Sequence, residues 1–102
     1  SLPADELLYF ASEIVKLPRR HAADLLYNHY SLDWRDVIKT IRLPSLMVGA
    51  EASIFSAESQ IWIADQFPGV EVEIFKADES GSHFMCYENP AKFNALVDAF
   101  LT

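Results

Sequence analysis

One histidine, His83, stands in surroundings that suit a catalytic base. It lies in the stretch Gly81-Ser82-His83-Phe84, after an apolar run and before Asn89-Pro90, which is a typical helix start. Histidine titrates near neutral pH, so it can accept a proton as a general base and return it as a general acid. Open α/β sheets carry their sites at the carboxyl ends of strands. His83 is therefore the candidate catalytic residue, and a structural or solvated loop histidine is the alternative.

Other chemistry-bearing residues give weaker signals. His21 and His29 lie on predicted helices, where surface or packing roles are the simpler interpretation. Asp78 and Glu79 precede His83 closely and are interpreted first as solvated loop residues. The alternative is that their charges favour the imidazolium, the protonated form of His83. No spacing of His, Cys, Asp and Glu matches a metal site, so we expect neither a metal nor a cofactor.

The elements that must position His83 follow from the apolar pattern. Helical spacing predicts helices over residues 1–16, 19–29 and 34–40, with Leu17-Pro18 breaking the first. The continuous apolar run Leu43–Gly49 is typical of a parallel strand buried on both faces. A helix over 56–67 follows. The alternating Val70–Phe75 predicts a strand with one wet face near a sheet edge.

The remaining residues complete the predicted order. Lys76 to Tyr87 is expected to be a loop, and Asn89 is expected to cap the last helix, with Pro90 at its first position. Two strands joined by one helix form a β–α–β unit with parallel strands. The fold class is therefore α/β, with two parallel strands and flanking helices. Residues 1–32 are interpreted as lid or connecting helices, and 33–102 as the strand–helix–strand–helix part.

Composition limits the function. The 102 residues leave room for one domain at most, and 51% hydrophobic residues argue against disorder. A net charge of −7 argues against nucleic acid and against anionic membrane surfaces as partners. No apolar run is long enough to span a bilayer. The single cysteine, Cys86, excludes an internal disulfide, so a reducing, cytoplasmic setting is expected.

Residues 33–101 resemble the C-terminal part of an α/β-hydrolase of the esterase and non-haem haloperoxidase-like type. Six pieces carry the resemblance: Asp33-Trp34-Arg35, Ile41–Gly49, Phe67-Pro68-Gly69, the edge strand Val70–Phe75, Gly81-Ser82-His83-Phe84, and Glu88-Asn89-Pro90 with Phe93-Asn94. The combination of Gly-x-His-Phe with Glu-Asn-Pro is the more specific part. The resemblance as a whole covers about two-thirds of the chain. Residues 1–32 then correspond to the end of a lid region.

The resemblance implies a catalytic triad in the order serine, acid, histidine. His83 matches the histidine, whereas no Gly-x-Ser-x-Gly elbow for the nucleophile occurs in the chain, so the sequence resembles the last third of such an enzyme. The family's acid position falls on Ala52, one residue after Glu51. Glu51 is one candidate acid. An acid from an upstream strand, a Ser-His dyad and a degenerate site are the alternatives. Phe84 is a candidate for lining the acyl pocket, with core packing as the alternative.

The resemblance implies a hydrolase acting on a small ester or acyl substrate, or a perhydrolase that makes a peracid with the same triad. These residues alone are expected to be inactive, because nucleophile and oxyanion hole are lacking. The alternative function is a non-catalytic ligand-binding or association module. The inner strand over Leu46–Val48 is expected to lack a neighbour. We therefore expect it to pair with the missing N-terminal part of the same domain, or to self-associate through this exposed sheet edge.

Overall fold

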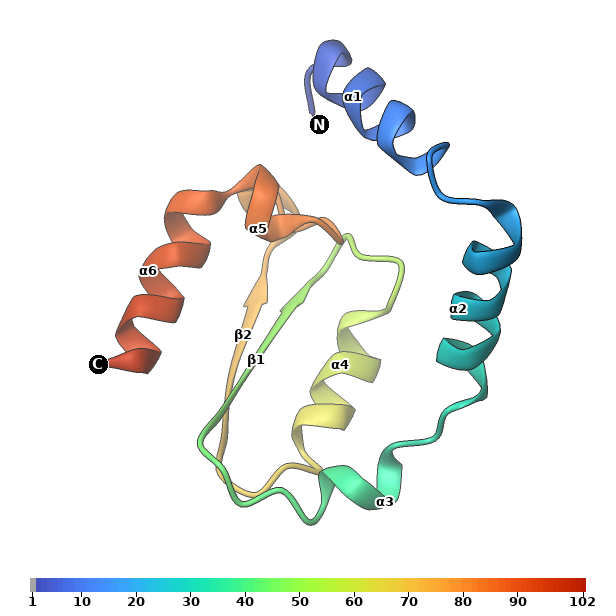
Figure 1. The fold of residues 1–102 in the computed structure, drawn as a ribbon. Coiled ribbons are helices and arrows are strands. Elements are labelled where there is room, and N and C mark those ends of the chain that lie inside the picture. The colour runs from blue at the N-terminus through green and yellow to red at the C-terminus, as the bar shows by residue number, and fades with distance from the viewer. Residues whose placement is uncertain (1) are drawn as a thin grey trace. The chain divides into compact units, whose positions relative to one another are not determined.

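The computed structural model describes residues 2–102. The chain divides into two compact units, residues 1–34 and 35–102, close to the boundary expected after residue 32. Figure 1 shows the elements of both units. Each unit is described by itself below.

The first unit consists of two helices, α1 (Ala4–Ile14) and α2 (Arg19–Ser31). Proline stands at the N-cap of each, and Asp5 and Glu6 occupy the first turn of α1, where carboxylates complement the helix dipole. Neither helix has a buried residue. Both expected helices are confirmed, whereas their role as a lid stays a prediction.

The second unit contains the sheet. In chain order its elements are α3 (Arg35–Ile38), β1 (Ser45–Ala50), α4 (Ala57–Ala64), β2 (Val70–Phe75), the 3-10 helix η1 (Ala77–Glu79), α5 (Met85–Glu88) and α6 (Pro90–Leu101). The strands run parallel, with the register extending from Ser45 opposite Val70 to Ala50 opposite Phe75. The mixed α/β class, with two parallel strands and flanking helices, is therefore confirmed.

Capping residues begin the two longer helices of this unit where expected. The Ser56 hydroxyl accepts the Ser59 N–H at 3.2 Å and begins α4. The Asn89 side-chain oxygen accepts the Lys92 N–H at 3.3 Å, with Pro90 in the first turn of α6. These contacts satisfy amides that the first turn of a helix leaves without a partner.

Helices cover both sides of the strands. Helix α4 packs against β1 and β2, and α6 lies on the other side of the strands in Figure 1. From α6, Lys92 places its ammonium group 4.4 Å from the centre of the Phe75 ring. Phe75 is fully buried, so β2 ends inside the core between these two layers.

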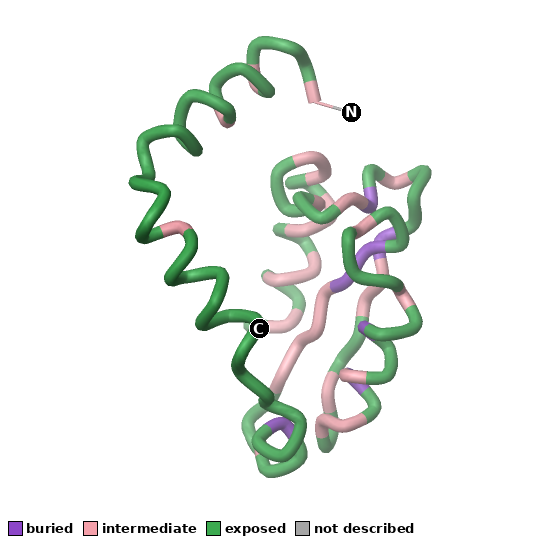
Figure 2. Tube along the Cα trace, turned by 90° about the vertical axis from the view of Figure 1, so that its right-hand side faces the viewer, coloured by how far each residue is buried: buried purple, intermediate pink, exposed green. Residues whose placement is uncertain are grey.

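The core is small and lies in the second unit (Figure 2). Among the described residues, its buried hydrophobic members are Ile38, Ala50, Ala64 and Phe75, and Gln60 is buried with them. Burial on β1 is concentrated at its carboxyl end, since Ser45 to Val48 are only half-buried. The expectation that this strand is buried on both faces is therefore wrong for its first four residues, because β2 is its one strand neighbour in the described sheet.

Two further expectations need correction. Val72 is 43% exposed beside the exposed Glu71, so burial on β2 does not alternate as its sequence does. The segment from Lys76 to Tyr87 is not a plain loop, because it contains η1 and the beginning of α5. Both are single turns, too short for the periodicity that identifies helices in sequence.

Candidate functional site

A bridge beyond the ends of the two strands brings His83 next to Ser53. After β2 the chain makes an excursion through η1 and then returns to the sheet, where Ser82 pairs in parallel with Ala52. The Ala52 N–H donates to the Gly81 carbonyl at 2.8 Å. The next residues along the two segments, Ser53 and His83, are consequently neighbours at the carboxyl edge of the sheet.

His83 contacts one polar side chain and two aromatic rings. Its Nδ1 lies 3.2 Å from the Ser53 hydroxyl oxygen. The ring centre of Phe55 is 5.8 Å from that of His83, and Phe84 meets the imidazole edge-on at 5.3 Å. His83 and Phe84 are both exposed. The structure therefore places Ser53 and Phe55 beside His83 and Phe84. The roles expected for His83 and Phe84 stay predictions.

The turn before His83 depends on the absence of a side chain at Gly81. Gly81 is buried, and its N–H donates to the Lys76 carbonyl at 3.0 Å, which closes the excursion on itself. A Cβ atom at Gly81 would lie 2.3 Å from the Lys76 oxygen and 2.4 Å from the Phe75 oxygen. Ser80 provides the reversal just before it, with φ of 61°.

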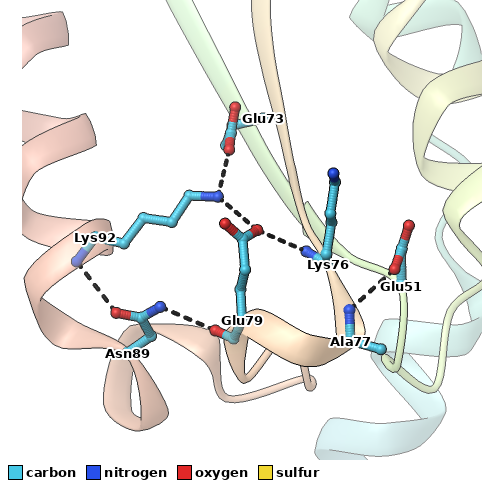
Figure 3. Close-up of polar contacts among 7 residues, drawn as sticks. All are labelled: Glu51, Glu73, Lys76, Ala77, Glu79, Asn89 and Lys92. Carbon is cyan, nitrogen blue, oxygen red and sulfur yellow. Dashed lines mark hydrogen bonds and ion pairs between the residues drawn. The ribbon is translucent and has the colours of Figure 1, made fainter.

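Glu51 lies at the beginning of the same excursion and not beside the imidazole. Its N–H donates to the Phe75 carbonyl, and its carboxylate accepts the Ala77 N–H at 2.9 Å (Figure 3). The carboxylate thus takes an amide at the start of η1. A role for Glu51 in orienting His83 stays a prediction, and the polar contact that the structure provides at Nδ1 comes from Ser53.

A second cluster fixes the far side of the excursion (Figure 3). Lys92 pairs with Glu73 at 2.7 Å and with Glu79 at 2.8 Å, and Glu79 also accepts the Lys76 N–H at 3.1 Å. Asn89 donates to the Glu79 carbonyl at 2.9 Å. These contacts connect β2, η1 and α6, which are the elements around the turn that carries His83.

The charges of this cluster shift each other's titration. The hydrogen bond from Lys92, followed by that from the Lys76 amide, lowers the pKa of the Glu79 carboxyl group. The hydrogen bonds to Glu73 and Glu79 raise the pKa of Lys92. Both shifts favour the charged forms, so the cluster is an ion-paired clamp at neutral pH.

Gln60 holds the segment that carries Ser53. Its side-chain amide binds both main-chain groups of Ala50 at 3.1 Å, as a neighbouring strand would, and it donates to the Phe55 carbonyl at 2.8 Å. The sequence analysis missed Gln60 and Ser53. Gln60 could have been noticed as a long amide among the apolar residues of the helix that packs against the strands. Ser53 could have been noticed because it follows Ala52, the position where α/β-hydrolases have their acid.

Residues 2–102 contain neither a cluster suited to a metal ion nor a helix suited to a bilayer. No group of three or more His, Cys, Asp or Glu side chains in this part of the chain is arranged to hold a metal ion. None of the helices described there combines the length and the apolarity that a bilayer crossing requires.

Comparisons of the chain with protein-family models, curated proteins and solved structures found no match.

Proposed function

We propose that His83 is the general base of an α/β-hydrolase acting on a small ester or similar acyl substrate. The observation that carries the proposal is the hydrogen-bonded His83–Ser53 pair at the carboxyl edge of a parallel sheet, where open α/β folds place their sites. The sequence resemblance to esterases and haloperoxidase-like enzymes supplies the reaction class. We also propose that the protein works in a reducing, cytoplasmic setting, because its single cysteine, Cys86, is free and exposed.

In this mechanism a serine from outside these residues attacks the acyl carbon. Ser53 occupies Nδ1 of His83, so Nε2 on the opposite side of the ring takes the proton of the attacking serine. The same nitrogen then returns that proton to the leaving alcohol and later activates water. The exposed ring of Phe84 beside the imidazole supports a role as one wall of the acyl pocket.

The test is hydrolysis of p-nitrophenyl acetate by the protein that contains this chain together with its upstream nucleophile. His83→Ala is expected to lower kcat by about 10²-fold or more, the contribution of a general acid–base group. His21→Ala is the matched control, because His21 is an exposed histidine of α2. Equal activity of the wild-type and His83→Ala proteins would contradict the proposal. Turnover by residues 1–102 alone, abolished by His83→Ala, would overturn the expectation of an outside nucleophile.

A second candidate function is association without catalysis, and the outer edge of β1 favours it. Gln60 takes the main-chain groups of Ala50, while the half-buried Leu46–Val48 have β2 as their one strand neighbour in the described sheet. A strand from the remaining part of the same domain, or from a second copy, would cover this edge. A full-length protein that does not react with a serine-directed fluorophosphonate probe would favour this function, and covalent labelling would exclude it.

The edge itself can be tested by sedimentation of residues 1–102. The N–H of Val48 points to the same side as that of Ala50, because successive residues of a strand alternate. Val48→Pro should therefore block pairing at the edge while leaving the bonds to β2 intact. A concentration-dependent dimer that this variant abolishes supports self-association. A monodisperse monomer at high concentration contradicts it.

A further inference from the structure

The contact of His83 with Ser53 stands where a hydrolase of this type has a carboxylate. Ala52 has no polar side chain, and the Glu51 carboxylate accepts the Ala77 N–H at 2.9 Å. We propose that Ser53 is the positioning residue for His83 and holds the imidazole in the tautomer that carries its proton on Nδ1. The proposal rests on the function proposed above, because it assigns the orienting group of that site.

The backbone explains why residue 53 and not residue 52 faces the imidazole. Ala52 is the residue that pairs with Ser82, and its N–H is bonded to Gly81. One step beyond the bridge both segments turn, and Ser53 and His83 meet there with 3.2 Å between the hydroxyl oxygen and Nδ1.

Ser53 is itself held in place. Its N–H donates to the Ala50 carbonyl at 3.3 Å, and its hydroxyl oxygen accepts the Phe55 N–H at 3.3 Å. The buried Gln60 amide binds the main chain of Ala50 and Phe55 on either side of it. The hydroxyl is thus fixed by a local turn that a buried side chain supports, as positioning of a catalytic group requires.

The hydrogen-bonding capacity of the hydroxyl fits this role. A serine oxygen can accept two hydrogen bonds. The Phe55 N–H provides one, and in the proposed tautomer the Nδ1–H of His83, whose nitrogen lies 3.2 Å away, provides the other. With the proton on Nδ1, the lone pair of Nε2 is free to accept a proton. The opposite arrangement, with the hydroxyl donating to Nδ1, would place the ring proton on Nε2 and remove the base.

A hydroxyl gives this orientation without the negative charge of a carboxylate. It therefore fixes the tautomer but adds little stabilisation to the imidazolium that forms during the reaction. Replacement by aspartate is sterically reasonable, because aspartate accepts the N–H two residues ahead in the same kind of turn that Ser53 makes with Phe55. Ser53→Asp should therefore increase kcat, whereas Ser53→Ala should lower it about two- to tenfold, the value of one neutral hydrogen bond.

The direct test is ¹⁵N NMR of the ring nitrogens of His83 in alkaline solution, where the ring is neutral, in wild-type protein and in Ser53→Ala. We expect the Nδ1–H tautomer to predominate in the wild type and the ratio to move toward Nε2–H in the variant. Ser53→Thr keeps the hydroxyl and should restore the wild-type ratio. Ser82→Ala is the control for a change in loop shape. The Ser82 hydroxyl accepts the Phe84 N–H, whereas the contact at Nδ1 of His83 comes from Ser53.

Predominance of the Nε2–H tautomer in the wild type, or an unchanged ratio in Ser53→Ala, would overturn the proposal. The measurement needs no substrate and no turnover. A failed ester assay with a normal tautomer shift would therefore reject the proposed function and leave the positioning role of Ser53 in place. Activity that depends on His83 but not on Ser53 would support the proposed function and reject the positioning role of Ser53.

Discussion

The two units of the chain differ in what holds them. In the first unit, α1 and α2 contain no buried residue, and large apolar side chains such as Leu8 and Tyr27 are 71% and 77% exposed. In the second unit, a parallel strand pair packs with helices, and Phe75 at the end of β2 and Gln60 on α4 are buried. The helices α1 and α2 are thus predictable from local periodicity without a core of their own, whereas the site requires a core that fixes backbone from separate parts of the chain. The His83–Ser53 pair lies where such a core exists.

The largest expected effect comes from removing the centre of the second unit. Phe75→Ala should lower the free energy of unfolding by about 3 to 5 kcal/mol, because it deletes a fully buried aromatic ring and leaves a cavity. Leu8→Ala in the first unit is the control and should change it by about 0.5 kcal/mol or less. Urea denaturation measures both. Similar losses of unfolding free energy for the two variants would contradict the inference that the core of the chain lies in the second unit.

A smaller loss is expected at the turn before His83. Gly81→Ala should cost about 3 kcal/mol or somewhat less, since a methyl group would overlap the carbonyls of Phe75 and Lys76. Gly69→Ala is the matched control, with φ of 74° and no heavy atom within 4 Å of the added Cβ. It should cost about 1 to 2 kcal/mol from backbone strain alone. Thermal unfolding compares the two, and an equal cost would refute the crowding at Gly81.

The smallest expected effect concerns the ion-paired clamp and its pH dependence. The pKa of Glu79 is lowered, so its contribution to stability is present above the ordinary value of 4.5 and is lost as pH falls through the folded-state value. The pKa of Lys92 is raised, so its contribution is present below 10.5 and is lost as pH rises further. Lys92→Met should flatten the acid side of a plot of Tm against pH.

The control for this clamp is Lys16→Met in the first unit. Lys16 pairs with Glu13 three residues earlier on the surface, and its side chain is 65% exposed, against 30% for Lys92. Exposed pairs at this spacing contribute little. The Tm profile of Lys16→Met should therefore follow that of the wild type. An equally flattened profile in this variant would show that the clamp is no stronger than an ordinary surface pair.

Local rules were enough to predict the two strands and the longer helices, but not the single turns η1 and α5. The alternation of Val70–Phe75, the cap at Asn89 and the proline that separates the first two helices each express a preference of a few neighbouring residues. They gave the α/β order, the parallel pair and His83 on a turn at the sheet edge. The hydrolase assignment, in contrast, depends on resemblance and stays a proposal.

Local sequence preferences therefore specify the two strands, the longer helices and the turn on which His83 lies. The partners of His83 depend on contacts between segments that are distant in the chain. The bridge of Ala52 with Ser82 aligns residues that are 30 positions apart, bringing Ser53 to Nδ1 and leaving Glu51 at Ala77. The physical reason is register. A shift of one residue turns a side chain to the opposite face, and this register is set by the closing of the turn at Gly81 and by the buried amide of Gln60.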